Sequence, residues 1–310
     1  MKIIKCGGSV LKNYNDRLQL YKEIKSSDEK VVLVVSAFND CPYSTDKLSL
    51  LLKDNYTYEM KQEIIVIGEI ISSLRVSNEL LNQYIDATLI YKEDIGINVF
   101  TTDKMEHIVN IDASKIIEAT NKHKVVVVPG FIGINQNNKI VSLNKNGSDL
   151  TAVIVAKMLK LEDVYLYKDV LGLASIDPKI ESNFKLYKDI SYSLMNQIIL
   201  HGSDLIQEDA IKFAKDNNIN IHIVHYLNHS YQTNISKSNK ERIIVFQIKE
   251  NNVYIDGYNN KDNIERHLLA KNILFDYILP CNTYLKIVTS YENELQIINT
   301  LHSIYMKGDL

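Results

Sequence analysis

The sequence predicts an α/β fold, a mostly parallel sheet sandwiched between helices, with a small α+β domain at its C-terminal end. Two runs, VVLVV from Val31 and VVVVP from Val125, are apolar throughout, as strands buried on both faces of a parallel sheet are. Segments with helical spacing separate such runs along most of the chain. Polar loops follow several of the runs, at the sheet edge where open α/β folds bind ligands.

The composition favours small molecules or proteins as partners. The net charge is -3, from 35 basic and 38 acidic residues mixed along the 310-residue chain, so no basic stripe for nucleic acid or a membrane surface stands out. Cys6, Cys41 and Cys281 are too scattered for a disulfide framework or a zinc site, which favours free thiols in a reducing cytoplasm. No signal peptide opens the chain and no apolar run approaches the ~18 residues that span a bilayer, so we expect a cytoplasmic protein.

The expected elements alternate in the order that a parallel sheet with crossover helices requires. Each strand is a short run of β-branched or aromatic residues, and each helix repeats its apolar residues every three or four positions. Strands are expected at residues 1–4, 30–36, 87–90, 99–102, 125–128, 163–167 and 220–224, and helices at 10–25, from about 47, at 60–81, 108–119, 151–159, 192–200 and 205–216.

The first strand runs directly into a turn that contains Lys5, Gly7, Gly8 and Ser9. The glycines leave room for a polyphosphate, the amides of the turn can donate to its oxygens, and the helix N-terminus that follows favours anions. Lys5 is then placed to neutralise charge on the transferred phosphate. The alternative is a tight strand-to-helix turn without a ligand.

The next strand ends in a second polar loop, where the hydroxyls of Ser36 and Thr45 are placed to meet a substrate carboxylate. Thr45, or Asp46 beside it, has the alternative role of a helix cap. Glu69 stands among isoleucines in the middle of the expected helix 60–81. Its carboxylate either faces solvent or is aimed into a site.

The strand at 125–128 leads through a Pro-Gly turn to a polar loop that ends in Gly147, Ser148 and Asp149. Gly147 permits the close approach of a ligand, and the hydroxyl and carboxylate that follow can bind one. Capping of the helix at 151–159 explains the same two side chains without a ligand.

A last polar loop follows the strand at 163–167 and carries Lys168, Asp169, Gly172 and, further on, Lys179. The lysines are suited to hold phosphates while Asp169 faces a ribose or base. Charges on a solvated turn are the alternative.

The chain is expected to divide into a first domain at 1–230, a linker at 231–242 and a small domain at 243–310. The segment HSYQTNISKSNKE, from His229, is polar and rich in Asn, Ser and Lys, as linkers are. Beyond it we expect an α+β sandwich without obvious chemistry, with strands at 243–249, 253–256, 273–279 and 283–289 and helices at 261–270 and 293–304.

Six motifs occur in order along residues 5–180: KCGGSV, VVSA followed by PYSTDKL, IGEIISS, VVVPGFIG, NGSDLTA and YKDVLGLASIDPKI. In sequence and spacing they resemble the amino-acid kinase family, and within it the aspartokinases. The PYSTDKL loop looks most like the monofunctional aspartokinases of Gram-positive bacteria. The C-terminal domain resembles a single ACT-type regulatory domain, whereas members of the family usually carry two.

The resemblance implies ATP-dependent phosphorylation of the L-aspartate side-chain carboxylate to 4-phospho-L-aspartate, which feeds the synthesis of lysine, diaminopimelate, threonine and methionine. It also implies Mg²⁺ that is carried by ATP rather than by direct protein ligands, and a homodimer formed by paired edges of the ACT-like sheets. The attacking carboxylate is already ionised near neutral pH, so positioning and charge neutralisation are the expected means of catalysis.

The resemblance assigns roles by position in the motifs. Lys5 and Asp149 are the expected catalytic residues, with Asp149 orienting Lys5 and the metal-phosphate unit. Glu69 is expected to pair with the substrate ammonium group. The substrate carboxylates are expected at Ser36, Thr45, Lys145 and Ser148, and the nucleotide at Lys5, Gly7, Gly8, Ser9, Lys168, Asp169, Gly172 and Lys179.

Three positions depart from the family pattern. Lys145 stands where the family has an arginine, and a lysine cannot make the bidentate clamp on an α-carboxylate that arginine makes. Asn146 replaces a glycine, and Asp204 replaces a nucleotide-contacting lysine and repels phosphate. Two alternatives therefore stay open: a catalytically degenerate binding or regulatory protein with the same fold, and a kinase for another acidic amino acid.

Overall fold

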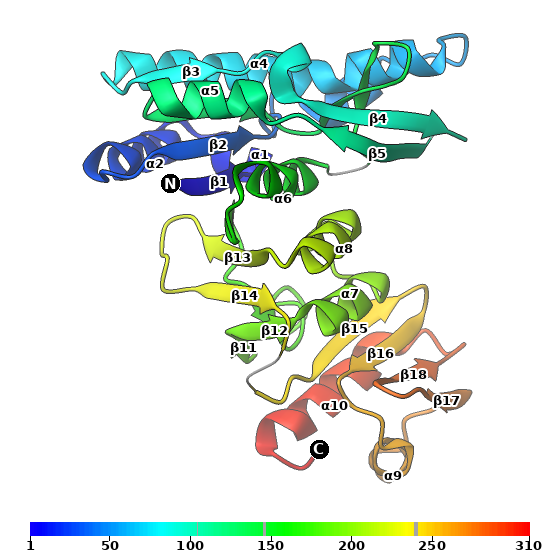
Figure 1. The fold of residues 1–310 in the computed structure, drawn as a ribbon. Helices are drawn as coiled ribbons and strands as arrows, with labels where there is room; N and C mark the ends of the chain where they lie inside the picture. Colours follow the sequence, from blue (N-terminus) through cyan, green and yellow to red (C-terminus); the bar gives the residue numbers. More distant parts are fainter. Residues whose placement is uncertain (104, 145–146, 239–240) are drawn as a thin grey trace. The chain divides into compact units, whose positions relative to one another are not determined.

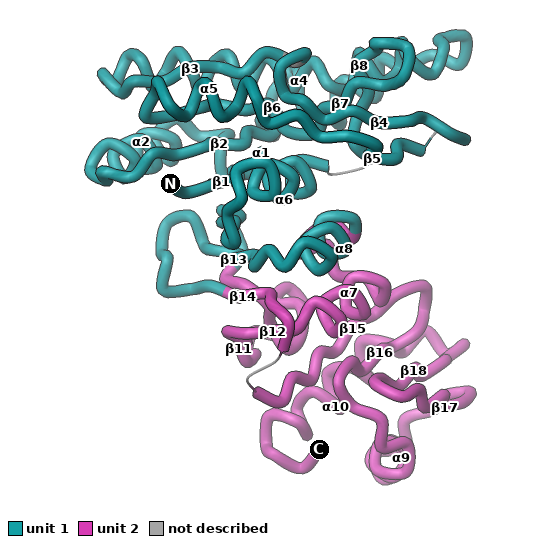
Figure 2. Tube along the Cα trace, viewed as in Figure 1, with its two compact units in different colours: residues 1–170, 209–232 teal, residues 171–208, 233–310 magenta. Residues whose placement is uncertain are grey.

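The computed structural model describes residues 1–103, 105–144, 147–238 and 241–310, with the side chain of Lys92 left out. The chain forms two compact units, coloured separately in Figure 2. One comprises residues 1–170 and 209–232, and the other residues 171–208 and 233–310. Among the described residues, no helix is both long enough and apolar enough to cross a membrane.

The first unit is built on a parallel sheet (Figure 1). Its strands pair in the order β13 (Asn220–His225), β9 (Asp163–Lys168), β1 (Lys2–Cys6), β2 (Val31–Val35), β6 (Val125–Pro129) and β3 (Ala87–Leu89). Every residue of β2 and β6 is buried, as their runs of valine predict for strands covered on both faces. The predicted mostly parallel sheet is therefore confirmed.

Helices connect and cover these strands. They are α1 (Gly8–Leu11), α2 (Tyr14–Ser26), α3 (Thr45–Ser49), α4 (Tyr58–Asn82), α5 (Ser114–Lys122), α6 (Ser148–Leu159) and α8 (Glu208–Asn217), with a 3-10 turn, η1, at Lys92–Ile95. Helix α6 packs against β1, β2 and β9, and it is buried along nearly all of its length because its sequence is apolar over two turns. Its first turn is thereby placed beside the central strands.

A second sheet lies in the same unit. Its order is β5 (Met105–Ile111), β4 (Ile97–Thr102), β7 (Ile132–Ile134) and β8 (Ile140–Ser142). The prediction of a helix from residue 108 is wrong for its first part, because residues 105–111 pair antiparallel with β4. Helix α5 begins only after Asp112, whose carboxylate accepts the backbone N–H of Ser114.

The second unit contains an antiparallel sheet in the order β15 (Val245–Lys249), β16 (Asn252–Asp256), β18 (Tyr284–Val288) and β17 (Tyr277–Pro280), with helices α9 (Lys261–Ala270) and α10 (Glu294–Lys307). All six elements expected beyond residue 242 are present. The order is that of a split β-α-β-β-α-β sheet whose last strand has moved to the start of the sequence.

The rest of this unit comes from residues 171–208 and 233–238. It holds strands β10 (Leu173–Ala174), β11 (Leu186–Tyr187), β12 (Asp189–Ser191) and β14 (Gln232–Ser236) and helix α7 (Tyr192–Leu200). Strand β14 falls inside the expected linker 231–242, although the segment is polar. It forms because it pairs in parallel with β12 and buries Thr233 and Ile235 on alternate positions.

Candidate active site

The carboxyl end of β1 places Lys5 against the first turn of α6. The ammonium Nζ of Lys5 lies 2.6 Å from Oδ1 of Asp149, and both side chains are buried. The sequence placed these residues in two separate motifs. The fold brings them together because α6 packs on β1.

Lys168, the last residue of the neighbouring strand β9, reaches the other oxygen of the same carboxylate. Its Nζ lies 3.0 Å from Oδ2 of Asp149. Burial disfavours the ionised form of Asp149, but Lys168 and Lys5 outweigh it and hold the pKa of this carboxyl well below its usual range. Burial, together with the charge of Lys5, lowers the pKa of Lys168 against the attraction of Asp149. Two cations around one carboxylate leave a surplus positive charge that suits an anionic ligand.

The glycine turn that follows Lys5 is shaped by two different constraints. A Cβ on Gly8 would stand 2.2 Å from the carbonyl oxygen of Ala37 and 2.3 Å from Oδ1 of Asn39. Gly8 therefore lets the loop after β2 lie against the turn. A Cβ on Gly7 would meet no atom closer than Nζ of Lys5 at 3.9 Å, so this glycine keeps the approach to the ammonium group open. Ser9 is half-buried in α1.

Glu69 is buried in the middle of α4, with 4% of its surface exposed, so the exposed alternative is excluded. Burial raises its pKa to about 8, although Lys5, the backbone N–H of Ala37 and the hydroxyl of Ser148 all favour the ionised form. Among the described residues, its Oε2 has no hydrogen-bond partner. A buried carboxylate oxygen without a partner is suited to receive a cationic group of a ligand.

Ser148 lies in the first turn of α6, directly before Asp149. The N-cap residue is Gly147, which has no side chain to cap the helix, and Ser148 and Asp149 follow it inside the first turn, so N-capping does not explain these two residues. A Cβ on Gly147 would stand 1.9 Å from the carbonyl oxygen of Leu143, and one on Gly130 would stand 2.6 Å from Cβ of Ser148. Gly130 therefore lets the Pro-Gly turn lie directly against the start of α6, and Gly147 lets the residue before α6 lie against the backbone of Leu143.

The loop after β2 carries Ser36 and Thr45. Ser36 is half-buried, and its N–H donates to the carbonyl of Cys6, 3.2 Å away, one residue before the Ala37 amide that contacts Glu69. Thr45 is the first residue of α3, and the cap is Ser44, whose hydroxyl accepts the N–H of Lys47. The alternative of a cap at Thr45 or Asp46 is thus wrong.

The expected nucleotide residues that follow Lys168 are divided between the two units. Asp169 is exposed at the end of β9. Gly172 and Lys179 belong to the second unit. There Gly172 has φ +117, and a Cβ on it would stand 2.6 Å from Oγ1 of Thr233, so packing alone explains this glycine. Lys179 and Asp204 are exposed, and Lys145 and Asn146 lie outside the described residues.

Two groups that help to form the surroundings of Glu69 were not anticipated from the sequence. The backbone amide of Ala37 carries no sequence signal, because any residue supplies it. Ser72, one turn after Glu69 on α4, accepts the N–H of Phe38 at 3.0 Å and ties the loop after β2 to the helix. A serine among isoleucines at helical spacing from Glu69 was the available signal.

The side chains of this site indicate how a metal ion would be bound there. Both oxygens of Asp149 are engaged by lysines, and the described residues contain no group of three or more His, Cys, Asp or Glu side chains that could hold an ion. The donors fit a phosphate group whose own oxygens carry the metal.

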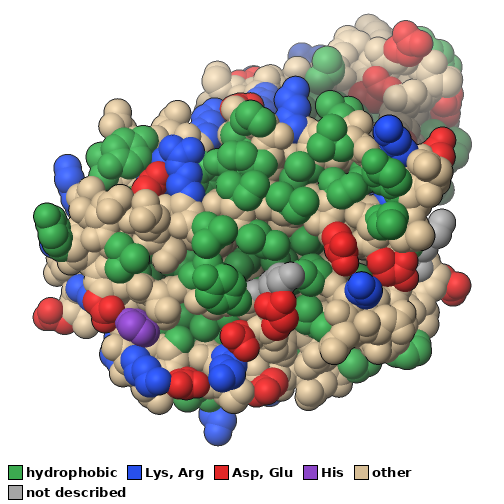
Figure 3. All heavy atoms as spheres, turned by 90° about the horizontal axis from the view of Figure 1, so that it is seen from above, with side chains coloured by type: hydrophobic (Ala, Val, Ile, Leu, Met, Phe, Trp, Pro, Cys, Tyr) green, Lys and Arg blue, Asp and Glu red, His purple; other side chains and the backbone are tan. Residues whose placement is uncertain are grey.

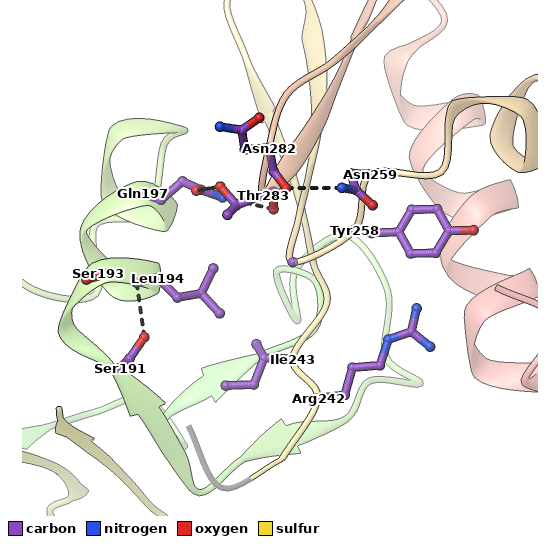
Figure 4. Close-up of a pocket in the computed structure, with 11 residues that line it drawn as sticks. Ser191, Ser193, Leu194, Gln197, Arg242, Ile243, Tyr258, Asn259, Asn282 and Thr283 are labelled. Carbon is purple, nitrogen blue, oxygen red and sulfur yellow. Dashed lines mark hydrogen bonds between the residues drawn. The ribbon is translucent and has the colours of Figure 1, made fainter. Parts of the chain in front are cut away.

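A separate cavity of about 520 Å³ lies within the second unit (Figure 4). Its lining includes Arg242, Tyr258, Asn282 and Thr283, and the guanidinium of Arg242 stands 5.7 Å from the centre of the Tyr258 ring. None of the expected site residues that the structure describes lines it.

The pattern of the amino acid kinase family matches residues 1–225. An aspartokinase of Bacillus sp. (strain MGA3) is 31% identical over 219 residues, which cover 70% of this chain and 52% of the relative. One of Geobacillus stearothermophilus is 28% identical over 275 residues, 87% of this chain and 60% of the relative. The chain thus spans between half and two thirds of the length of these relatives.

Solved structures are similar in fold. The crystal structure of E. coli aspartokinase III in complex with aspartate and ADP superposes with a TM-score of 0.68 at 14% identity and covers 97% of this chain and 84% of that one. The structure of an isopentenyl phosphate kinase superposes with a TM-score of 0.55 at 15% identity over 76% of this chain. At such identities the likeness concerns the fold alone.

Proposed function

This chain belongs to the amino acid kinase family, and we propose that it transfers the γ-phosphoryl group of ATP to the side-chain carboxylate of L-aspartate. A carboxylate oxygen of aspartate attacks the γ-phosphorus, the bond to the β,γ-bridging oxygen breaks, and 4-phospho-L-aspartate and ADP leave. The similarity to relatives named aspartokinase supports this choice of substrate. The product then enters the synthesis of the aspartate-derived amino acids.

The observation that carries the proposal is the contact of Lys5 and Lys168 with one carboxylate, that of Asp149. Phosphoryl transfer to an ionised carboxylate needs no general base, because no proton has to leave the nucleophile. It needs fixed positive charge beside the three equatorial phosphoryl oxygens, on which negative charge develops. In this proposal Asp149 holds the two ammonium groups in place, and Lys5 contacts the transferred group.

Glu69 receives the ammonium group of aspartate in this proposal. The supporting observation is its Oε2, which has no hydrogen-bond partner among the described residues. A bound ammonium group stabilises the ionised carboxylate of Glu69, which burial alone disfavours. The hydroxyls of Ser36, Thr45 and Ser148 bind the substrate carboxylates, with Lys145 adding a positive charge.

The nucleotide phosphates are proposed to lie over the amides of Gly7, Gly8 and Ser9. The open space beside Gly7 supports this placement. Lys168 serves the same phosphates. When it is bound with ATP, Mg²⁺ supplies charge neutralisation on the β- and γ-phosphates. Asp169, the residue after Lys168, is proposed to face the ribose or base of the nucleotide.

Residues 243–310 are proposed to be a single ACT-like module that follows a catalytic domain at 1–230. The split β-α-β-β-α-β order of its sheet supports this assignment.

The test measures ADP release from ATP and Mg²⁺ with and without L-aspartate, and traps the acyl phosphate as its hydroxamate. Aspartate-dependent ADP in equal amount to hydroxamate is the expected result. Folded protein that binds nucleotide but forms neither product at saturating aspartate would favour a catalytically degenerate binding protein. Turnover with a different acidic amino acid in a parallel panel would identify another carboxylate substrate.

A further inference from the structure

Helix α4 has two sides with different surroundings. Figure 3 shows hydrophobic side chains gathered on the face seen from above, along which α4 runs in Figure 1. Ile67 and Leu74 of this outward face are 40% and 46% exposed. A second stripe consists of four residues three or four positions apart, which therefore lie on one side of the helix: Gly68, Ser72, Arg75 and Glu79. This stripe contacts the loop after β2.

The backbone of the loop is fixed to the stripe at two points. A Cβ on Gly68 would stand 2.3 Å from the carbonyl oxygen of Tyr43, so the loop lies directly against the helix there. The N–H of Phe38 donates to Oγ of Ser72 at 3.0 Å. The helix thus holds the loop beside Glu69, which lies next to Gly68 on α4.

Two guanidinium groups lie beside the side chain of Phe38. The ring is buried, and its centre lies 4.7 Å from Cζ of Arg17 and 5.5 Å from Cζ of Arg75, within the range of cation–π attraction. Both groups donate to the carboxylate of Glu79, Arg17 at 2.7 and 2.9 Å and Arg75 at 2.9 Å. Nη1 of Arg75 also donates to the hydroxyl of Tyr43 at 3.4 Å. Glu79 therefore fixes two cations beside one ring of the loop.

The two arginines differ in exposure. The side chain of Arg17 is 1% exposed, whereas that of Arg75 is 50% exposed. An exposed ion pair adds little to stability, and the pair of Arg17 with Glu79 stays complete without Arg75. Loss of Arg75 is therefore expected to loosen the loop without unfolding the protein.

We propose that Arg75 is a positioning residue for L-aspartate, which acts through Phe38 on the loop after β2. The inference rests on the proposed function, in which Ser36 binds a substrate carboxylate and Glu69 binds the ammonium group. Ala37, between Ser36 and Phe38, directs its N–H at Glu69. A displaced Phe38 therefore changes the distance between the two groups that bind the ends of the substrate.

The groups that bind phosphate belong to other elements. Lys5, Asp149 and Lys168 come from β1, α6 and β9, and none of them contacts the Phe38 ring. Arg75 therefore acts on the affinity for aspartate rather than on the transfer of the phosphoryl group.

The first test is the steady-state kinetics of Arg75→Met. We expect the KM for aspartate to rise about 10-fold, while kcat and the KM for ATP stay within about twofold of wild type and the urea midpoint of unfolding is unchanged. Arg75→Lys keeps the charge but loses the guanidinium fork, so its KM is expected between those of wild type and Arg75→Met. Arg266→Met, at an exposed position of α9, is the control and is expected to match wild type.

A double-mutant cycle tests the route through Phe38. Phe38→Leu keeps a buried apolar side chain but has no aromatic ring, and is expected to raise the KM for aspartate to a similar degree. Arg75→Met should then add less than about twofold in the double variant, because the same interaction can be lost only once. Independent, multiplying effects of the two substitutions would contradict the route.

The reactivity of Cys41 reports on the loop without any substrate. Its Sγ donates to the carbonyl of Phe38 at 3.0 Å. Cys6 is fully buried, so in a Cys281→Ser background a maleimide reacts with Cys41. We expect Arg75→Met to speed this reaction about 10-fold, since a loosened loop opens more often.

The two kinds of measurement separate this proposal from the proposed function. An unchanged KM for aspartate or unchanged Cys41 rates in Arg75→Met would overturn the role of Arg75. So would a general loss in which kcat, affinity for ATP and the urea midpoint fall together. A wild type without aspartate turnover would instead refute the proposed function, and the Cys41 rates would still decide whether Arg75 holds the loop.

Discussion

Nζ of Lys5 lies 2.6 Å from Oδ1 of Asp149, in a place where both side chains are almost free of solvent. The pair joins the first strand of the sequence to a helix that begins more than a hundred residues later. Removal of either charge would leave the other buried without a counter-charge, which is costly. Substitution of Lys5 or Asp149 is therefore expected to destabilise the site strongly.

Asp149→Asn tests the central carboxylate. It leaves Lys5 and Lys168 facing each other in a buried place without a counter-charge, so we expect a loss of about 3 kcal/mol in the free energy of unfolding. We also expect a fall of about 100-fold or more in the rate of phosphoryl transfer, because the lysines lose their fixed positions. Urea unfolding and ADP release measure the two effects. Asp54→Asn, at an exposed position, is the control; equal losses in both variants would refute the assignment.

Glu69 predicts a pH-dependent affinity for aspartate. Its pKa is raised from 4.5 to about 8, so the free protein holds the proton near neutral pH, and a bound ammonium group expels it. We expect aspartate binding at pH 7 to release about one proton, measured by calorimetry in buffers of different ionisation enthalpy. Glu69→Gln is expected to abolish the proton release and raise the KM for aspartate about 10-fold or more. Unchanged proton release in that variant would exclude Glu69 as its source.

The raised pKa of Glu69 also predicts how the free energy of unfolding changes with pH. A carboxyl whose folded pKa is raised binds more protons in the folded than in the unfolded state between pH 4.5 and about 8. The free energy of unfolding therefore falls as pH rises through this window, by at most about 1.4 kcal/mol per pH unit from this group. Urea titrations at several pH values should show a flatter profile for Glu69→Gln. A profile as steep as that of the wild type contradicts the shift.

The two adjacent glycines of the first turn are expected to respond differently to the same change. Gly8→Ala forces a methyl group to 2.2 Å from the Ala37 carbonyl oxygen, so we expect a stability loss of about 1–3 kcal/mol and a displaced loop. Gly7→Ala meets no atom closer than 3.9 Å, and is expected to fold normally but lose affinity for ATP, because its methyl group stands beside the Lys5 ammonium. Thermal unfolding and nucleotide titration separate the two. Tight nucleotide binding by Gly7→Ala would remove the turn from the proposed phosphate site.

Substitution of Arg17 is expected to reduce the stability of the fold rather than the rate of catalysis. It is 1% exposed, and its guanidinium donates to both oxygens of Glu79 at 2.7 and 2.9 Å. Burial opposes ionisation of Glu79, but Arg17 and Arg75 outweigh it and lower its pKa, so this contribution to stability is present at neutral pH and is lost as pH falls through the lowered value. Arg17→Met is expected to cost about 3 kcal/mol in urea unfolding. Arg17→Met/Glu79→Leu should recover part of the loss; no recovery would mean that packing, not charge, dominates.

The glycine turn and the valine strands were predictable because their signals are local. A strand that runs into two glycines next to Lys5 marks a tight turn before a helix, and a run such as that in β2 is typical of a strand covered on both faces. Strand β14 was missed, since its polar sequence becomes a strand only through its partner β12. The start of α5 was misplaced for the same reason, because pairing with β4 decided residues 105–111.

The sequence by itself determined the alternating order of elements, the family motifs and the residue types of the site, because these depend on composition and on spacings of a few residues. Only the tertiary structure decided that Glu69 is buried rather than exposed, and that Lys168 contacts Asp149. It also decided which apolar face of α4 stays open. Burial and ion pairing depend on neighbours that come from distant parts of the chain, so no local sequence pattern can predict them.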